Sequence, residues 1–384
     1  MIRSLFRTMY TQRIKQKRMF WGTIISMWAC LASPIFAQHT VTDSIDKEEQ
    51  QAEDSRVKWE LCAITEGQWN MTDGKGGWAN RVDANLQVGL WQGATLSTGI
   101  LSTYRPTEDV TEVMQDFSNI NAQNRPLRLV HFGLEQKWKN FSAFAGLRQA
   151  DEDYFCSPIA GIATGASCGC VPTVNDNFVI NVFPMTAMGV HFTYAPTTAW
   201  LAQVSVYNGK AYDTLNRSFR FRPHTDGILS LGSITYTPTT ADAANDDAFV
   251  PTYLLGWNIG NHQRDDTETR HTQMGYWITA EQPIGHLGRM GVALAATISH
   301  QIKDPETAKF YYNATLAMNN LTRRGGTLAV LVNRAYYSDA HETELEATFT
   351  HPLGKYFSLQ PALHYYSTSG KKQMMGSLRV ILNL

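Results

Sequence analysis

The chain has 384 residues, with 33 lysines and arginines against 34 aspartates and glutamates, and a formal net charge of −1. This balance differs from the basic profile of nucleic-acid-binding proteins, so we expect no nucleic-acid partner. The mean hydropathy is −0.27, and no long apolar run follows residue 37, so no transmembrane helix is predicted. A membrane protein with these averages must alternate apolar and polar residues along strands.

The N-terminus has the features of an export signal. A basic region over residues 3–18 precedes an apolar segment, 19–32, that is too short to span a bilayer as a helix. Small residues then offer cleavage after Ala37. We therefore predict a secretory signal peptide over 1–37, with a retained membrane anchor as the alternative. Residues 38–56 are polar and acidic, which predicts a periplasmic linker before a barrel domain over 57–384.

Four cysteines follow the predicted signal peptide. An exported protein meets an oxidising compartment, so Cys156 is expected to pair with Cys168 or Cys170 inside one loop, with Cys62 outside the disulfide. Zinc binding is the alternative, but no pair of histidines lies nearby at ligand spacing. We predict no metal site and no cofactor.

From residue 57 onward, segments of about ten residues alternate apolar and polar positions between turn residues. This is the signature of a transmembrane antiparallel β-barrel, although a soluble β-sandwich also alternates. The predicted fold is all-β, with about sixteen strands. They are expected near 57–70, 80–90, 93–104, 126–138, 141–150, 185–196, 199–208, 226–237, 251–261, 273–283, 289–302, 309–320, 326–337, 342–352, 357–368 and 373–384.

The connections between these segments are alternately short and long. The long ones include 105–125, 151–184 and 209–225, and their partners are mostly tight turns. Short periplasmic turns and longer extracellular loops are typical of outer-membrane barrels. The connection at 238–249 is too long for this scheme. Either the strand register is displaced there, or a periplasmic turn carries an insertion.

The 151–184 loop has a small, apolar middle and polar edges. A loop of this length in a barrel is usually functional. We expect it to fold into the lumen and narrow the pore, because large barrels otherwise leave an open channel; the alternative is packing over the barrel mouth. The residues predicted to form the constriction are Arg148, Asp151, Glu152 and Asp153.

Polar, charged and aromatic residues occupy the inward phase of several predicted strands. Mixed charge offers donors and acceptors to hydroxyl groups without a field of one sign, and Tyr207 is a candidate platform for a sugar ring. The sequence contains no GxSxG, HExxH or phosphate-binding glycine loop, so no enzyme and no catalytic residue is predicted. The predicted lumen residues are His131, Glu135, His191, Tyr207, Trp277, Glu281, Glu344, Glu346 and Arg379, with His364 in the same phase.

The run from FAGLRQADEDYF through NVFPMTAMGVHFTYAPTTAWLAQVSVYNG resembles the carbohydrate-selective porins of the OprB type. The features that carry the resemblance are Gly146, Gln149, Asp153, Phe155, Pro184, Gly189, Pro196 and the segment 206–209. The segments GKGGWANRVDANLQVGLW and LQPALHYY…GSLRVILNL fit the same pattern. Two features depart from it: the chain ends on Leu384 rather than phenylalanine, and the cysteine-bearing loop has no counterpart.

The resemblance implies a sixteen-stranded channel in the outer membrane of a Gram-negative bacterium, surrounded by lipid and passing small sugars by passive diffusion. By analogy, it also implies a homotrimer. The final strand, 373–384, is expected to engage the barrel assembly machinery. A general or ion-preferring diffusion porin remains an alternative, as does an outer-membrane barrel enzyme or adhesin.

Overall fold

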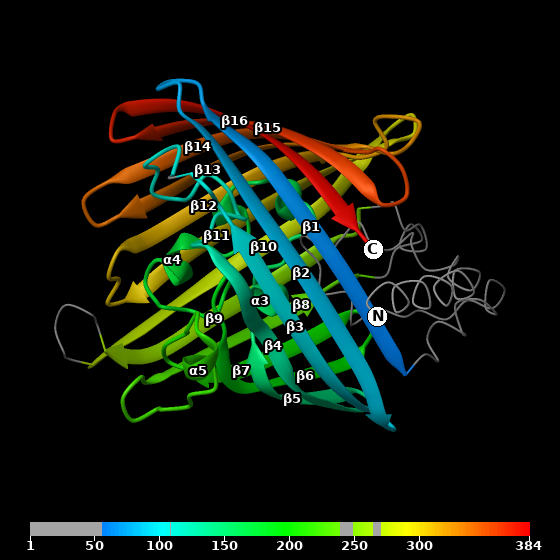
Figure 1. The fold of residues 1–384 in the computed structure, drawn as a ribbon, viewed down its shortest axis with the longest axis vertical. Coiled ribbons are helices and arrows are strands. Elements are labelled where there is room, and N and C mark those ends of the chain that lie inside the picture. Colours follow the sequence, from blue (N-terminus) through cyan, green and yellow to red (C-terminus); the bar gives the residue numbers. More distant parts are fainter. Residues whose placement is uncertain (1–55, 108, 239–248, 264–269) are drawn as a thin grey trace, which may run out of the picture.

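The computed structural model describes residues 56–107, 109–238, 249–263 and 270–384. The predicted signal peptide and nearly all of the predicted linker therefore lie outside the described residues. The described part forms one β-barrel that encloses several loops (Figure 1).

Sixteen antiparallel strands form the barrel, and β1 closes it by pairing with both β2 and β16. The predicted fold class is confirmed, and each strand lies within a few residues of its expected position. The strands are β1 (Val57–Asn70), β2 (Gly76–Trp91), β3 (Ala94–Tyr104), β4 (Arg125–Trp138), β5 (Phe141–Arg148), β6 (Ala187–Thr197), β7 (Trp200–Asn208), β8 (Ile228–Tyr236), β9 (Thr252–Gln263), β10 (Arg270–Leu287), β11 (Met290–Lys303), β12 (Ala308–Met318), β13 (Thr327–Tyr337), β14 (His341–Pro352), β15 (Phe357–Thr368) and β16 (Lys371–Asn383).

The named helices are short, and all of them lie in loops. Four belong to the loop between β5 and β6: α3 (Asp151–Tyr154), η2 (Ala160–Ile162), η3 (Ala166–Cys168) and α4 (Pro172–Asn175). The fifth, α5 (Leu215–Ser218), lies between β7 and β8. Within the described ranges, no helix is both long enough and apolar enough to cross a membrane.

The two rims of the barrel differ in the length of their connections. Both ends of the barrel domain, at Val57 and Leu384, lie on the rim of mostly short turns, and the long loops lie on the opposite rim. The long β8–β9 connection is on the short-turn rim. Tyr236 pairs with Tyr253 across it, and both strands keep the predicted phase, so a displaced register is excluded. The extra length is an insertion whose residues 239–248 lie outside the described part.

Backbone geometry explains one tight turn on the long-loop rim. Strands β15 and β16 are joined by Ser369 and Gly370, with φ angles of 47° and 94°. Two successive positive φ angles are what a type I′ hairpin turn requires, and its twist matches that of the strands. The turn fixes Thr368 opposite Lys371 and so sets the register of the last strand.

Outward-facing side chains of the barrel are predominantly apolar and exposed, with aromatic rings near the rims. On the short-turn rim the Trp200 and Tyr236 rings are 4.6 Å apart, and Trp138 and Phe141 are stacked at 5.4 Å. Such rings suit the boundary between hydrocarbon and headgroups. Tyr311 is fully buried and faces inward, because it alternates with the outward Tyr312.

Candidate pore constriction

The loop between β5 and β6 lies inside the barrel; we call its residues 151–184 the inner loop. Most of its residues are buried, including both apolar side chains and polar ones such as Thr164 and Asn177. The loop contacts inward-facing residues from β10 to β16. This location agrees with the prediction that the loop enters the lumen, and it excludes packing over the mouth.

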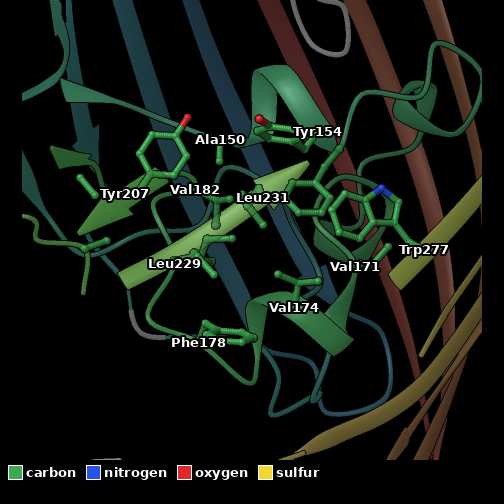
Figure 2. Close-up of a cluster of buried hydrophobic side chains, with 14 of the residues drawn as sticks. Ala150, Tyr154, Val171, Val174, Phe178, Val182, Tyr207, Leu229, Leu231 and Trp277 are labelled. Atoms are coloured by element: carbon green, nitrogen blue, oxygen red, sulfur yellow. The ribbon is translucent and has the colours of Figure 1, made fainter. Parts of the chain in front are cut away.

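An apolar cluster holds the first and last parts of the inner loop against the wall (Figure 2). Phe155 packs on Trp277 with ring centroids 4.9 Å apart. Val174 and Phe178 belong to the same cluster as Leu231 of β8. Full burial of one apolar side chain of this size contributes about 1.5–3 kcal/mol relative to leaving it exposed. The small, apolar middle of the loop packs in two smaller clusters, where Ile159 lies with Ala293 and Ala295, and Ala163 lies with Leu331.

Glu281 of β10 anchors the loop through hydrogen bonds. Its Oε1 accepts the backbone N–H of Ile159 at 3.0 Å and also accepts the Ser157 hydroxyl. The residue is 1% exposed. A buried carboxylate is costly unless it is hydrogen-bonded, so its stability depends on the loop donors.

Glu346 of β14 makes a second anchor. It accepts the N–H of Thr164 at 2.6 Å, the Thr164 hydroxyl at 2.8 Å and the N–H of Gly165 at 3.1 Å. Glu342 on the same strand holds the loop between β3 and β4 in the same way, by accepting the N–H groups of Met114 and Gln115 at 2.9 and 2.8 Å. Two carboxylates of one strand thus hold two different loops.

Arg379 of β16 connects both loops to the wall. It forms an ion pair with Glu66 and donates to the Ser118 hydroxyl at 3.0 Å and the Thr164 carbonyl at 3.2 Å. Asn119 also donates its N–H to the Thr164 carbonyl at 2.9 Å. The two loops are therefore joined to each other as well as to the barrel.

Within the described ranges, one group of buried side chains has metal-ligand chemistry: Glu344, Glu346 and His364. Glu344 accepts from His364 Nδ1 at 2.9 Å, Tyr366 at 2.6 Å and Asn333 at 2.6 Å. His364 Nε2 lies 3.0 Å from the Thr164 hydroxyl. These hydrogen bonds occupy the lone pairs that a cation would need, so the cluster suits a structural network better than a metal centre.

Arg148 at the end of β5 forms a bidentate pair with Asp153 of α3, at 2.6 and 2.5 Å. His191 Nε2 lies 3.8 Å from the same carboxylate. Burial raises the pKa of Asp153, but Arg148 and His191 outweigh that effect and hold it below its ordinary value. Asp153 thus stays ionised and fixes the start of the inner loop to the strand that precedes it.

The two acidic residues before Asp153 have pKa values that are shifted in the opposite direction, upward. Burial raises the pKa of Glu152 to about 7, and the neighbouring Asp151 carboxylate adds to the effect. Burial also raises the pKa of Asp151, which accepts the N–H of Phe183 at 3.2 Å. Glu152 is nevertheless accessible to water inside the barrel. Its charge therefore changes near neutral pH at the edge of the lumen.

The inward-facing residues form two contrasting surfaces. Along β10–β16 they are buried under the loops; we call this surface the covered side. Along β1–β4, from the short turns to about the middle of the wall, inward side chains remain partly or fully accessible; we call this surface the open side. The open side consists of Lys58, Glu60, Cys62, Arg81, Asp83, Asn85, Gln87, Thr95, Ser97, His131, Glu135 and Lys137.

The predicted lumen residues divide between these surfaces and the region under the inner loop. His131 and Glu135 are on the open side, with Arg148 at its edge. Glu281, Glu344, Glu346 and Arg379 are on the covered side, where they hold loops. Tyr207 and Trp277 face inward but are 0% and 1% exposed, and His191 is 2% exposed. A sugar ring therefore cannot stack on Tyr207 in this structure, because the inner loop covers it.

Three arginines near the constriction were missed as site residues. Arg81 of β2 pairs with Asp83 at 2.7 Å and lies 4.3 Å from the centre of the Phe183 ring. Arg125 pairs with Asp213 at 2.9 Å. Arg128 donates to the Pro184 carbonyl at 3.4 Å. The inward phase of Arg81 is visible in the sequence, because Arg81 lies two positions from the inward Asp83. Arg128 is three positions from the inward His131, so strict alternation would place it outward, and a register shift between β3 and β4 brings it inward. The proximity of the three arginines depends on how the loops fold.

The expected loop disulfide is not formed. None of the four cysteines in the described ranges is disulfide-bonded. Cys156 donates to the backbone carbonyls of Asp151 and Glu152 at 3.1 and 3.0 Å, whereas Cys168 packs against Leu331 of β13. The thiols are thus directed to different neighbours, and burial raises the pKa of each cysteine in the loop.

Comparisons with known proteins agree with this architecture. The family model described as "Carbohydrate-selective porin, OprB family" matches residues 72–376. The high-pH structure of Pseudomonas putida OprB is similar with a TM-score of 0.75 and 15% identity, over 87% of this chain and 96% of that one. A mutant porin of Rh. blastica gives 0.54 and 8% identity, over 85% and 100%. Comparison with curated protein sequences gives no match.

Proposed function

The chain belongs to the OprB family of carbohydrate-selective porins, and from this membership we propose that sugars cross its lumen along the open side, through a constriction that the inner loop forms. The protein is an outer-membrane channel of a Gram-negative bacterium, and it is not an enzyme. The path of the solute and the residues that line it are our proposal.

The observation that carries the proposal is the contrast in accessibility between the two surfaces. Loop residues fill the space in front of β10–β16, whereas Arg81, Asp83 and Asn85 on β2 remain accessible to water. Water and solute need an unfilled part of the lumen. The accessible strands β1–β4 supply one, and Arg148 and Glu152 lie where the inner loop begins.

The chemistry of the open side suits neutral, hydroxyl-rich solutes. Lysine, arginine, aspartate, glutamate and amide side chains alternate there, so donors and acceptors are both present. The Arg81–Asp83 pair leaves each side chain about one-fifth exposed. Opposite charges at close spacing give hydrogen-bonding groups without a strong net field, which favours sugars over ions of either sign.

Blocking the open side tests this path. Cys62 of β1 faces inward on the open side, whereas Cys168 is 6% exposed under the inner loop. We expect a charged methanethiosulfonate reagent to reduce single-channel current in planar bilayers and to weaken the block by added oligosaccharide. The Cys62→Ser variant is the control and should be insensitive. A reagent that leaves the wild-type current unchanged would contradict the path.

A general diffusion porin is the second candidate. It would give steady channels whose current is indifferent to oligosaccharide. The same recording therefore separates the two candidates before any variant is made.

We also propose two partners. The final strand β16, which alternates up to Asn383, is the segment that the barrel assembly machinery would engage. A homotrimer is proposed by analogy with other sixteen-stranded porins. Native mass spectrometry of the purified protein tests the homotrimer. A monomer in every detergent used would contradict it.

A further inference from the structure

The outer wall has a groove where β1 meets β2 and β16, near the long-loop rim. Its volume is about 670 Å³, and its apolar lining includes Trp69, Trp78, Met71 and Leu378. All four side chains are at least 41% exposed on the outward face. These strands lie side by side in Figure 1. The groove is therefore open to the membrane.

The strand register explains why a groove forms here. Gly67 of β1 lies between Trp78 of β2 and Leu378 of β16, and Trp69 lies between Gly76 and Gly376. Along each of these strands a glycine therefore alternates with a large apolar residue, and each large side chain lies beside a glycine of the neighbouring strand. Positions two residues apart along a strand are about 7 Å apart, which is wide enough for one extended acyl chain.

Cationic side chains lie at the end of the groove on the long-loop rim. Lys372 shares the outward face of β16 with Met374 and Leu378, and it pairs in register with Ser367. Lys371 precedes it, and Lys75 lies in the β1–β2 turn, which is bonded to β16 through Met71 and Met374. All three lysines are exposed.

We propose that this groove binds a phosphorylated, multi-acyl glycolipid of the outer leaflet. One acyl chain would lie between Trp69 and Trp78, and a phosphate would contact Lys372 with support from Lys75. The position supports this occupant, since long loops face the outside of the cell and the groove is at their level. The charge supports it as well, because cations next to an apolar surface attract anionic headgroups.

Native mass spectrometry of the detergent-solubilised protein with bisphosphorylated lipid A tests the proposal. Gly67→Leu fills the groove: a Cβ at Gly67 would have its nearest neighbour, an atom of the Trp78 ring, at 4.0 Å, so little strain is expected. Ala296→Leu adds similar bulk to the exposed outward face of β11 and is the matched control. Lys372→Glu removes the cation, and Lys303→Glu on the rim of β11 is its control.

We expect the wild type and both controls to bind one lipid A, and we expect Gly67→Leu and Lys372→Glu to weaken binding roughly tenfold. Heat-modifiable migration confirms that each variant is folded. Equal binding by all variants, or no binding by the wild type, would overturn the proposal. Trimers or dimers of the wild type that Gly67→Leu converts to monomers would instead assign the groove to a second copy of the chain.

Discussion

The open side and the covered side are built from the same alternating pattern, yet they have different roles. On β2, Arg81 and Asp83 pair with each other and remain accessible to water. On β14, Glu342 and Glu346 are buried and accept backbone N–H groups from two loops. Alternation therefore determines which side chains face inward. The loops determine whether an inward side chain is accessible to water or covered by protein.

The difference also explains where the charges are placed. A carboxylate in water needs no protein partner, whereas a buried one needs several donors. Glu281 and Glu346 have such donors from the inner loop. Their stability and the position of the loop are consequently coupled. No such coupling is expected for Glu135 on the open side.

Deleting residues 160–170 should have the largest effect. This part of the inner loop covers β14 and β15, so its removal would uncover Glu346 and His364 and widen the lumen. We expect single-channel conductance to rise several-fold in planar bilayers, with heat modifiability retained. Unchanged conductance in a folded variant would show that the inner loop does not form the constriction.

Replacing one anchor should destabilise the loop without opening the pore fully. Glu346→Ala leaves the N–H groups of Thr164 and Gly165 without their acceptor, and we expect a loss of about 2–4 kcal/mol in the free energy of unfolding. Denaturant titration in detergent measures it. Glu346→Gln keeps an acceptor and should lose less. Glu135→Ala on the open side is the control. An equal loss of stability in that variant would contradict the distinction between the covered side and the open side.

Substitutions on the open side should change sugar binding and leave stability almost unchanged. Arg81→Ala removes a donor from the proposed path, and we expect oligosaccharide block of the channel to weaken about threefold. The half-blocking concentration measures it. The matched variant Arg379→Ala should instead mainly reduce stability, because Arg379 is buried with Glu66. If Arg81→Ala leaves the oligosaccharide block unaltered, the solute path does not run along β2.

The smallest expected effect depends on pH. The pKa of Glu152 is raised to about 7, so the side chain is mostly neutral below pH 7 and negative above it. Preference for cations should therefore increase modestly between pH 6 and 8. Reversal potentials in a salt gradient measure this change. Glu152→Gln should abolish it, and persistence in that variant would assign the titration to another group, such as Asp176, whose pKa burial also raises to about 7.

Much of this architecture follows from the sequence, because period-two alternation is a local property. The strands and the inward phase of Tyr207 and Trp277 are examples. The burial of those two rings could not be predicted. They lie under inner-loop residues such as Phe155, whose contacts are with residues distant in sequence. The same limit applies to the cysteines: proximity along the loop suggested a disulfide, whereas the folded loop directs Cys156 and Cys168 to different neighbours.

The anchors of the inner loop have a consequence for biogenesis. Ile159 bonds to a residue 122 positions later in the chain, Thr164 to residues 182 and 215 positions later. Contacts across such separations form late, because long segments must first be ordered. The loop emerges during synthesis well before the strands that hold it. The proposed constriction of this channel is therefore complete only when its C-terminal third is in place, and an unfinished barrel would lack the anchors of the inner loop.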